Sequence, residues 1–443
     1  MLKTYSGLLS ISIVLSMRLD LSVEKHLILE DQYEGTNITK ATFTQLVDHF
    51  DVLNNNTWSQ EYFVDTTHWK GPGYPIFIYI GGEGDVESRS FDWPWCREYA
   101  AEFNALCFVL EHRFYGQSQP FGFKNPTKYE KKLLTASQAL ADASVFITEM
   151  NRLYDSKPDL KWLAFGCSYA GTLATWLRLK YPDLVHGAIA SSAPLLAQLH
   201  YPEYFQHLEK SFYDQHPECL SAIKAAEHDY QESKDLLCQK IDTCYNKNFN
   251  VLGWVLKVET MQYHDFRNSN WNYHLICKYM TDPSSGDHFH RFVELWKHKS
   301  MKNQKYISWS DERAWNYQKC HEFGWFKTHS GIRTLKSAIE DSCDQFSDKF
   351  EENVIEENIA QTNFLFGGKE LNVSNVVFLH GSLDPWSVMG RTEPWPNEDV
   401  DVMVIEGASH CQDYWGNHDN WPQMKLAKSK IRQRLQEWKN SDF

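Results

Sequence analysis

The stretch "LAFGCSYAGTLATWLRLKYP", residues 163–182, decides how the rest of the chain is interpreted. It begins with apolar residues typical of a buried strand, turns sharply through small residues around Ser168, and continues with helical spacing. A serine in the pattern G-x-S-x-G between a strand and a helix is typical of a nucleophile, because the glycines let strand and helix approach closely. Here the turn is "GCSYAG", with Ala170 in place of the second glycine. The stretch predicts that Ser168 is a nucleophile.

The surrounding sequence predicts alternating strands and helices. Apolar runs typical of buried parallel strands cover residues 74–82, 105–112, 185–194, 375–386 and 400–411. Helical spacing covers residues 91–104, 134–154 and 424–439, and Thr135 with Gln138 has the arrangement of a capping box. Strands separated by helices form an α/β sheet with helices on its faces. Together with the turn at Ser168, this predicts an α/β-hydrolase fold.

The alternation stops between residues 196 and 370. This long segment is rich in Trp and Tyr, reads as mostly helical, and carries six of the ten cysteines. A sheet that pauses and then resumes implies an insertion, so we expect a large, mostly helical, disulfide-containing cap. The expected organisation is a signal peptide at 1–22, a hydrolase domain at 23–195, a cap domain at 196–370, and the rest of the hydrolase domain at 371–443.

Composition and the N-terminus indicate an exported protein. The 443 residues carry a formal net charge of -14, which argues against nucleic acid or an anionic membrane as a partner. The opening "MLKTYSGLLSISIVLSMRLDLS" has the layout of a signal peptide, although a loosely packed leader is an alternative. Sequons at Asn37, Asn55 and Asn372 favour glycosylation. We expect a glycoprotein that is secreted or in the lysosomal or endosomal lumen.

Ser168 needs a base, and the base needs an orienting carboxylate. In this fold the carboxylate and the histidine follow the last two strands, so the triad residues occur along the chain in the order Ser, Asp, His. The residues at these two places are Asp384 and His410. Taken singly, Asp384 reads as a turn residue before Pro385 and His410 as a surface histidine, but all three positions together favour a triad. For the oxyanion hole we expect the backbone N–H of Tyr169 and, jointly, Gly82 and Glu83.

At these residues the sequence resembles a known family. The motifs "GGEGD", "EHRFYGQSQP", "LTASQALAD", "GCSYAG", "SSAP", "WNYQKCHEFGW", "HGSLDPW" and "EGASHC" occur in this order across nearly the whole mature chain. They resemble the family of prolyl carboxypeptidase, dipeptidyl peptidase II and thymus-specific serine protease. The resemblance implies an α/β-hydrolase with a disulfide-bonded helical cap, the same triad, and action in lysosomes or outside cells. The "YAG" and "SHC" elements look closer to the thymus-specific branch.

The resemblance also implies a substrate pocket and part of the disulfide pattern. Trp386 matches an aromatic position that helps form the proline pocket of the prolyl enzymes, whereas Thr172 replaces a Met there and should weaken proline selectivity. The family usually has Gly where this chain has Cys167, which we expect to be a buried thiol and not a reactive one. The implied disulfides are Cys219–Cys277 and Cys244–Cys320, with the partners of Cys238 and Cys343 left open.

These observations predict a serine exopeptidase that hydrolyses short peptides through an acyl-enzyme, with a proline-related preference as one outcome. A carboxylesterase or lipase could use the same triad, and a non-catalytic hydrolase-fold binding protein is a further alternative. No cofactor or metal is expected, because no H-E-x-x-H or C-x-x-C spacing occurs. Peptide substrates are the expected partners, with a homodimer left open and no membrane partner.

Overall fold

The computed structural model describes residues 27–32, 37–154, 161–232, 251–252, 255, 270–300, 309–329, 333–394, 396, 399–414 and 420–441. The predicted signal peptide at residues 1–22, together with Cys238 and Cys244, lies outside these residues. Among the helices that are described, none has the length and apolar character needed to cross a bilayer. The sequon residues Asn37, Asn55 and Asn372 are all exposed.

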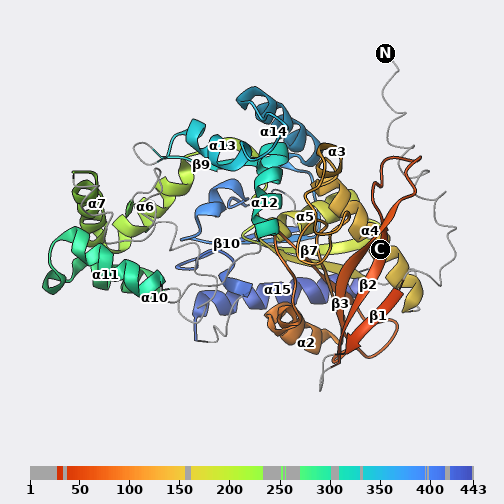
Figure 1. Ribbon diagram of the computed structural model, residues 1–443. Coiled ribbons are helices and arrows are strands. Elements are labelled where there is room, and N and C mark those ends of the chain that lie inside the picture. Colours follow the sequence, from red (N-terminus) through yellow and green to blue (C-terminus); the bar gives the residue numbers. More distant parts are fainter. Residues whose placement is uncertain are drawn as a thin grey trace, which may run out of the picture.

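A nine-stranded sheet forms the centre of the molecule, in the order β1-β2-β3-β5-β4-β6-β7-β10-β11 (Figure 1). The strands are β1 (Leu27–Gln32), β2 (Ile38–Leu46), β3 (Thr57–Asp65), β4 (Ile76–Ile80), β5 (Leu106–Leu110), β6 (Trp162–Cys167), β7 (Val185–Ser191), β10 (Val376–Gly381) and β11 (Val400–Ile405). From β5 to β11 the neighbours are parallel, whereas β1, β2 and β3 extend the sheet with antiparallel pairs. The parallel strands confirm the sequence prediction; the antiparallel extension was not predicted.

Helices cover both faces of this sheet, because its central strands carry apolar side chains on both faces. Alternate residues of β4 point to opposite faces: Ile78 packs in a core with α4 and α5, and Phe77 packs in a second core with α15. Both side chains are fully buried. The helices flanking the sheet are α2 (Ala101–Phe103), α3 (Lys128–Lys131), α4 (Ala136–Leu153), α5 (Tyr169–Lys180) and α15 (Pro422–Asn440). This arrangement is the predicted α/β-hydrolase fold.

The chain between β7 and β10 is inserted, because these two strands pair directly with each other. It contains β8 (Gln198–Tyr201), α6 (Glu203–Gln215), α7 (Pro217–Glu232), α10 (Asn270–Thr281), α11 (His288–Ser300), α12 (Trp309–Gln318), β9 (Gly324–Lys327), α13 (Leu335–Cys343) and α14 (Glu352–Phe366). Helices α6, α7, α10 and α11 share an apolar core to one side, and α12 to α14 lie above the sheet (Figure 1). The segment is mostly helical, as expected, but β8 and β9 form a small parallel sheet that was not predicted.

The disulfides correct two expectations. Four disulfides join described residues: Cys96–Cys107, Cys167–Cys411, Cys219–Cys277 and Cys320–Cys343. The pair Cys219–Cys277 is as the resemblance implies. Pairing Cys244 with Cys320 was wrong, because Cys320 and Cys343 pack in one core with Cα atoms 6.0 Å apart, within bonding range. Cys167 is likewise not a thiol: it is bonded to Cys411.

A buried ion pair connects α4 to the loop that follows β5. The side chains of Arg113 and Asp142 are both fully buried. Arg113 donates two hydrogen bonds to the Asp142 carboxylate, at 2.6 and 2.7 Å, and His49 contacts the same carboxylate at 2.7 Å. Burial raises the pKa of Asp142, but the charge of Arg113 and these hydrogen bonds outweigh burial and lower the pKa below its usual value.

We predict that Asp142→Asn lowers the free energy of unfolding by about 3 kcal/mol or more, because it leaves the Arg113 charge buried without compensation. Chemical denaturation with the disulfides intact measures this loss. The matched control is Glu149→Gln on the same helix, where Glu149 pairs with Arg152 at 2.8 Å on the exposed surface. That change should cost less than about 1 kcal/mol. Equal losses for the two variants would contradict the prediction.

Candidate active site

Ser168 lies in a strained turn between β6 and α5. Its φ of 59° is in the left-handed region that residues with a side chain seldom adopt. A Cβ atom on Gly166 would lie 2.1 Å from the carbonyl oxygen of Ala170, and one on Gly171 would lie 2.8 Å from the carbonyl oxygen of Ser191. Positions 166 and 171 therefore require glycine. The turn presents Ser168 at the end of β6, partly exposed.

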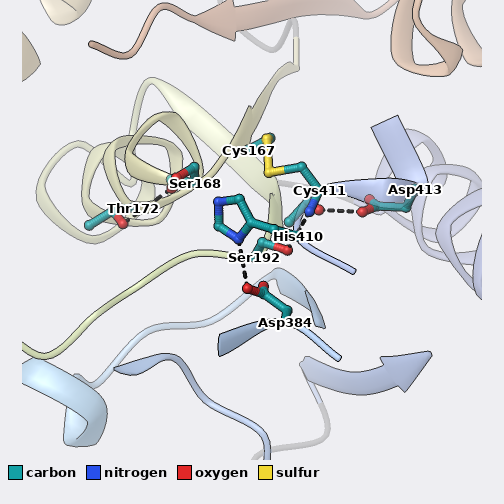
Figure 2. Close-up of a disulfide and its surroundings, with 9 residues drawn as sticks. Cys167, Ser168, Thr172, Ser192, Asp384, His410, Cys411 and Asp413 are labelled. Carbon is teal, nitrogen blue, oxygen red and sulfur yellow. Dashed lines mark hydrogen bonds and ion pairs between the residues drawn. A yellow bond between two sulfur atoms is a disulfide. The ribbon is translucent and has the colours of Figure 1, made fainter. Parts of the chain in front are cut away.

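Asp384 and His410 meet beside this turn. Asp384 follows β10 and His410 follows β11, and Nδ1–H of His410 donates to Oδ1 of Asp384 at 2.8 Å. Burial alone would raise the pKa of Asp384, but the charge and hydrogen bond of His410 outweigh it and hold the pKa below its usual value. Figure 2 shows the His410 ring between Asp384 and Ser168, with its second nitrogen on the side of Ser168. The arrangement suits proton transfer from a serine hydroxyl.

A disulfide joins the turn to the histidine loop. Cys167, next to Ser168, is bonded to Cys411, next to His410, although the two cysteines are 244 residues apart in sequence (Figure 2). Both cysteines are buried, so the bond lies in the interior, next to the candidate triad. This link was not predicted from the sequence, although "GCSYAG" and "EGASHC" both carry a cysteine beside a candidate triad residue.

Two serines at the end of β7 reinforce this connection. The carbonyl oxygen of Ser191 accepts a hydrogen bond from the Ser168 N–H at 2.9 Å, and its hydroxyl donates to Asp413. The hydroxyl of Ser192 accepts from the Cys411 N–H at 2.8 Å. Burial raises the pKa of Asp413 to about 6. The serines of "SSAP" therefore hold both loops, a role that the motif alone did not reveal.

A polar network anchors the side chain of Tyr169. Its hydroxyl contacts Nε2 of His112 at 3.1 Å and accepts from the Gln318 amide at 2.9 Å, while Tyr115 donates to the same Gln318 at 2.5 Å. Burial lowers the pKa of His112 to about 4, so the ring is neutral at neutral pH. Because Nδ1–H of His112 donates to a carbonyl, Nε2 accepts from Tyr169. His112 of the motif "EHRFYG" and Gln318 of the motif "WNYQKC" thus both contact Tyr169, the residue after Ser168.

The glycine-rich loop after β4 lies against the start of α5. A Cβ atom on Gly82 would be 3.5 Å from the backbone nitrogen of Ala170, which brings the loop next to Tyr169. Gly82 and Glu83 are partly exposed, as is Ser168. Burial raises the pKa of Glu83, while a hydrogen bond from its own amide and the charges of His410 and Lys327 act in the opposite direction. The loop expected to supply the second oxyanion donor therefore lies beside Tyr169.

The two expected pocket residues differ in accessibility. Trp386 is partly exposed, and its ring lies 6.2 Å from that of His410. Thr172 is fully buried, and its hydroxyl donates to the Pro194 carbonyl at 2.8 Å. The Thr172 hydroxyl is therefore hydrogen-bonded within the protein.

Among the described residues, one group of acids has the spacing for a cation: Glu61, Asp85 and Glu111. Glu61 is paired with Lys40 at 2.7 Å. Burial raises the pKa of Glu111 to about 9, so this group is protonated at neutral pH and is a poor cation ligand. We assign no metal to it.

The chain is also similar to known proteins. The family described as "Serine carboxypeptidase S28" matches residues 45–298 and 267–431. The chain belongs to the serine carboxypeptidase S28 family. This S28 protein is therefore a serine peptidase, which confirms the resemblance inferred from the motifs.

Its relatives match over nearly the full chain. Thymus-specific serine protease of Mus musculus is 29% identical, covering 89% of this chain and 86% of that protein. Lysosomal Pro-X carboxypeptidase of Homo sapiens is 27% identical, covering 91% of this chain and 88% of that protein. A solved proline iminopeptidase from Mycobacterium smegmatis aligns at 12% identity over 89% of this chain and 98% of that chain, with a TM-score of 0.40.

We predict that the double variant Cys167→Ser, Cys411→Ser lowers kcat more than it changes KM, because it loosens the turn relative to the histidine loop. A shift of about 1 Å at the reacting groups is enough to cost on the order of 100-fold in rate. Steady-state kinetics on a peptide substrate measure both constants.

The matched control is Cys219→Ser, Cys277→Ser, which removes a disulfide far from Ser168. Each double variant should lose about 2 to 5 kcal/mol of stability, but only the first should lose most of its kcat at a temperature where both remain folded. A wild-type kcat in the folded Cys167, Cys411 variant would refute the positioning role.

Proposed function

We propose that this S28 protein is an exopeptidase that hydrolyses short peptides through an acyl-enzyme on Ser168. The observation that carries the proposal is the Asp384–His410 hydrogen bond of 2.8 Å beside a serine held at positive φ. Strained backbone persists where the surrounding structure holds it in place, and such residues are concentrated at active sites.

The mechanism assigns one role to each group. Ser168 Oγ attacks the scissile carbonyl while His410 Nε2 takes its proton, and Asp384 stabilises the imidazolium that forms. The N–H of Tyr169, with the loop of Gly82 and Glu83, stabilises the negative oxygen. His410 then gives its proton to the leaving amine, and water hydrolyses the acyl-enzyme by the same route.

The restriction to short peptides and chain ends rests on the inserted segment. Helix α6 packs against the turn after Asp384, so part of the insertion lies beside the candidate site. A folded protein substrate would have to pass this segment to reach Ser168. The relative named lysosomal Pro-X carboxypeptidase supports an action at chain ends. Trp386 offers a flat apolar face for a compact side chain, which supports a proline-related preference.

The proposed location is a secreted or lysosomal lumen. The relative named lysosomal Pro-X carboxypeptidase supports it. Four disulfides among the described residues are typical of an oxidising compartment, and the three sequon asparagines are exposed where a glycan would attach.

We predict that the purified protein removes residues from the ends of peptides in a mixed library, and that Ser168→Ala lowers the rate by about 10⁴- to 10⁶-fold. Mass spectrometry of the products at pH 5 and pH 7 identifies the cleaved bonds. A fluorophosphonate probe should label wild-type Ser168 and leave the alanine variant unlabelled.

The control is Ser221→Ala on α7, which removes an exposed hydroxyl that bonds only the Pro217 carbonyl; it should still be labelled at Ser168. Cuts mainly inside long peptides would contradict the exopeptidase assignment. Hydrolysis of esters but not peptides would favour the carboxylesterase alternative.

A further inference from the structure

The side chain of Tyr169 packs against the inserted segment. Tyr169 is the first residue of α5, directly after Ser168, and it is buried. Its ring lies 5.4 Å from that of Trp315 on α12 and 5.3 Å from that of Phe323. Phe323 is the last residue of η6 (Lys319–Phe323), which continues α12. A residue of the expected oxyanion hole is therefore in contact with the insertion as well as with the sheet.

Gln318 adds hydrogen bonds to this contact. It is the last residue of α12, and it is fully buried. Its amide nitrogen donates to the Tyr169 hydroxyl at 2.9 Å and to Oε2 of Glu322 at 3.1 Å. Its amide oxygen accepts from the Tyr115 hydroxyl at 2.5 Å. Both sides of the amide group are thus engaged, which fixes the orientation of the Gln318 side chain.

His112 decides the direction of the hydrogen bond between Gln318 and Tyr169. Nδ1–H of His112 donates to the Arg113 carbonyl at 2.7 Å, and the lowered pKa of the ring, about 4, leaves Nε2 without a proton at neutral pH. Nε2 therefore accepts from the Tyr169 hydroxyl, at 3.1 Å. Because a hydroxyl has only one proton to give, the Tyr169 oxygen must accept from its other neighbour. An amide nitrogen at position 318 meets this requirement, whereas a carboxylate there does not.

Glu322 connects Gln318 to the part of the molecule that contains the sheet. The two oxygens of its carboxyl group accept from the N–H of Ala136, at 2.9 and 3.1 Å. Ala136 is the first residue of α4, which packs on the sheet. Between Gln318 and Glu322, Cys320 is bonded to Cys343. This part of the insertion is therefore held from two sides.

We propose that Gln318 is a positioning residue for catalysis: by holding the Tyr169 hydroxyl, it keeps the backbone N–H of Tyr169 directed at the oxygen that becomes negative in the transition state. The inference rests on the proposed function, in which that N–H is an oxyanion donor. Such a donor is effective because it is already oriented before the reaction, so that no reorganisation is needed. The insertion then contributes to the rate of the reaction and not only to access.

The variant Gln318→Met tests the inference, because methionine is of similar size and lacks the N–H donors. We predict a kcat about 10- to 100-fold lower with KM nearly unchanged, a smaller loss than removal of an oxyanion donor causes. A peptide aldehyde, whose adduct with Ser168 places a tetrahedral oxygen at the same position, should bind more weakly by a similar factor. Kinetics are measured at a temperature where circular dichroism shows the variant folded.

A double-variant cycle with Tyr169→Phe separates positioning from a general structural effect. This change removes the hydroxyl and keeps the backbone N–H. If the two residues act through their hydrogen bond, Gln318→Met lowers kcat in the wild-type protein but has little further effect on kcat in Tyr169→Phe. Independent structural losses would multiply instead.

The matched control is Gln45→Met. Gln45 is also buried, and its amide nitrogen also donates two hydrogen bonds, to Gln60 and to the Asp142 carbonyl, both at 2.8 Å. It lies on β2, however, and β3, β5 and β4 separate this strand from β6 in the sheet. The control should lose stability but keep the wild-type kcat and aldehyde affinity.

A wild-type kcat and aldehyde affinity in folded Gln318→Met would overturn the inference, and so would losses that multiply in the double variant. If the wild-type protein cleaved no peptide, the proposed function would fail, and the inference with it. Peptide cleavage by the wild-type protein together with an unaffected Gln318→Met variant would refute the inference alone.

Discussion

The close contact between β6 and α5 at Ser168 is the constraint on which the candidate site depends. Neither residue 166 nor residue 171 has room for a Cβ atom, because each packs against backbone oxygen atoms. Strand and helix can therefore meet only with glycine at both positions, and Ser168 takes the strained conformation that this approach requires. The hydroxyl of Tyr169, the next residue, is held by His112 and Gln318.

Two distant parts of the chain must be joined for the candidate triad to form. Ser168 lies before the inserted segment, and Asp384 and His410 lie after it. Pairing of β7 with β10 brings the two parts into one sheet, and the Cys167–Cys411 bond and the Ser192 hydrogen bond then join the loops themselves. Buried polar groups are costly unless they are satisfied, so this network favours one relative position of the two loops.

The inserted segment and the sheet contribute different properties to the same site. The strands and their loops carry the groups proposed for chemistry, whereas Tyr204 and Lys327 come from the insertion and meet Trp386 beside His410. Thr172 is buried in α5, and its hydroxyl bonds the Pro194 carbonyl, so it belongs to the part of the molecule that holds the backbone in place.

The sequence by itself determined the parallel strands, the flanking helices and the turn at Ser168, because apolar periodicity and glycine sterics act over about ten residues. It also led to Asp384 and His410 through the strand order of the fold. Only the tertiary structure decided that Cys167 is bonded to Cys411, that Cys320 is bonded to Cys343 and not to Cys244, and that Lys327 lies against Trp386. These contacts join residues far apart in the chain, and their geometry arises only when the packed sheet and its insertion bring them together.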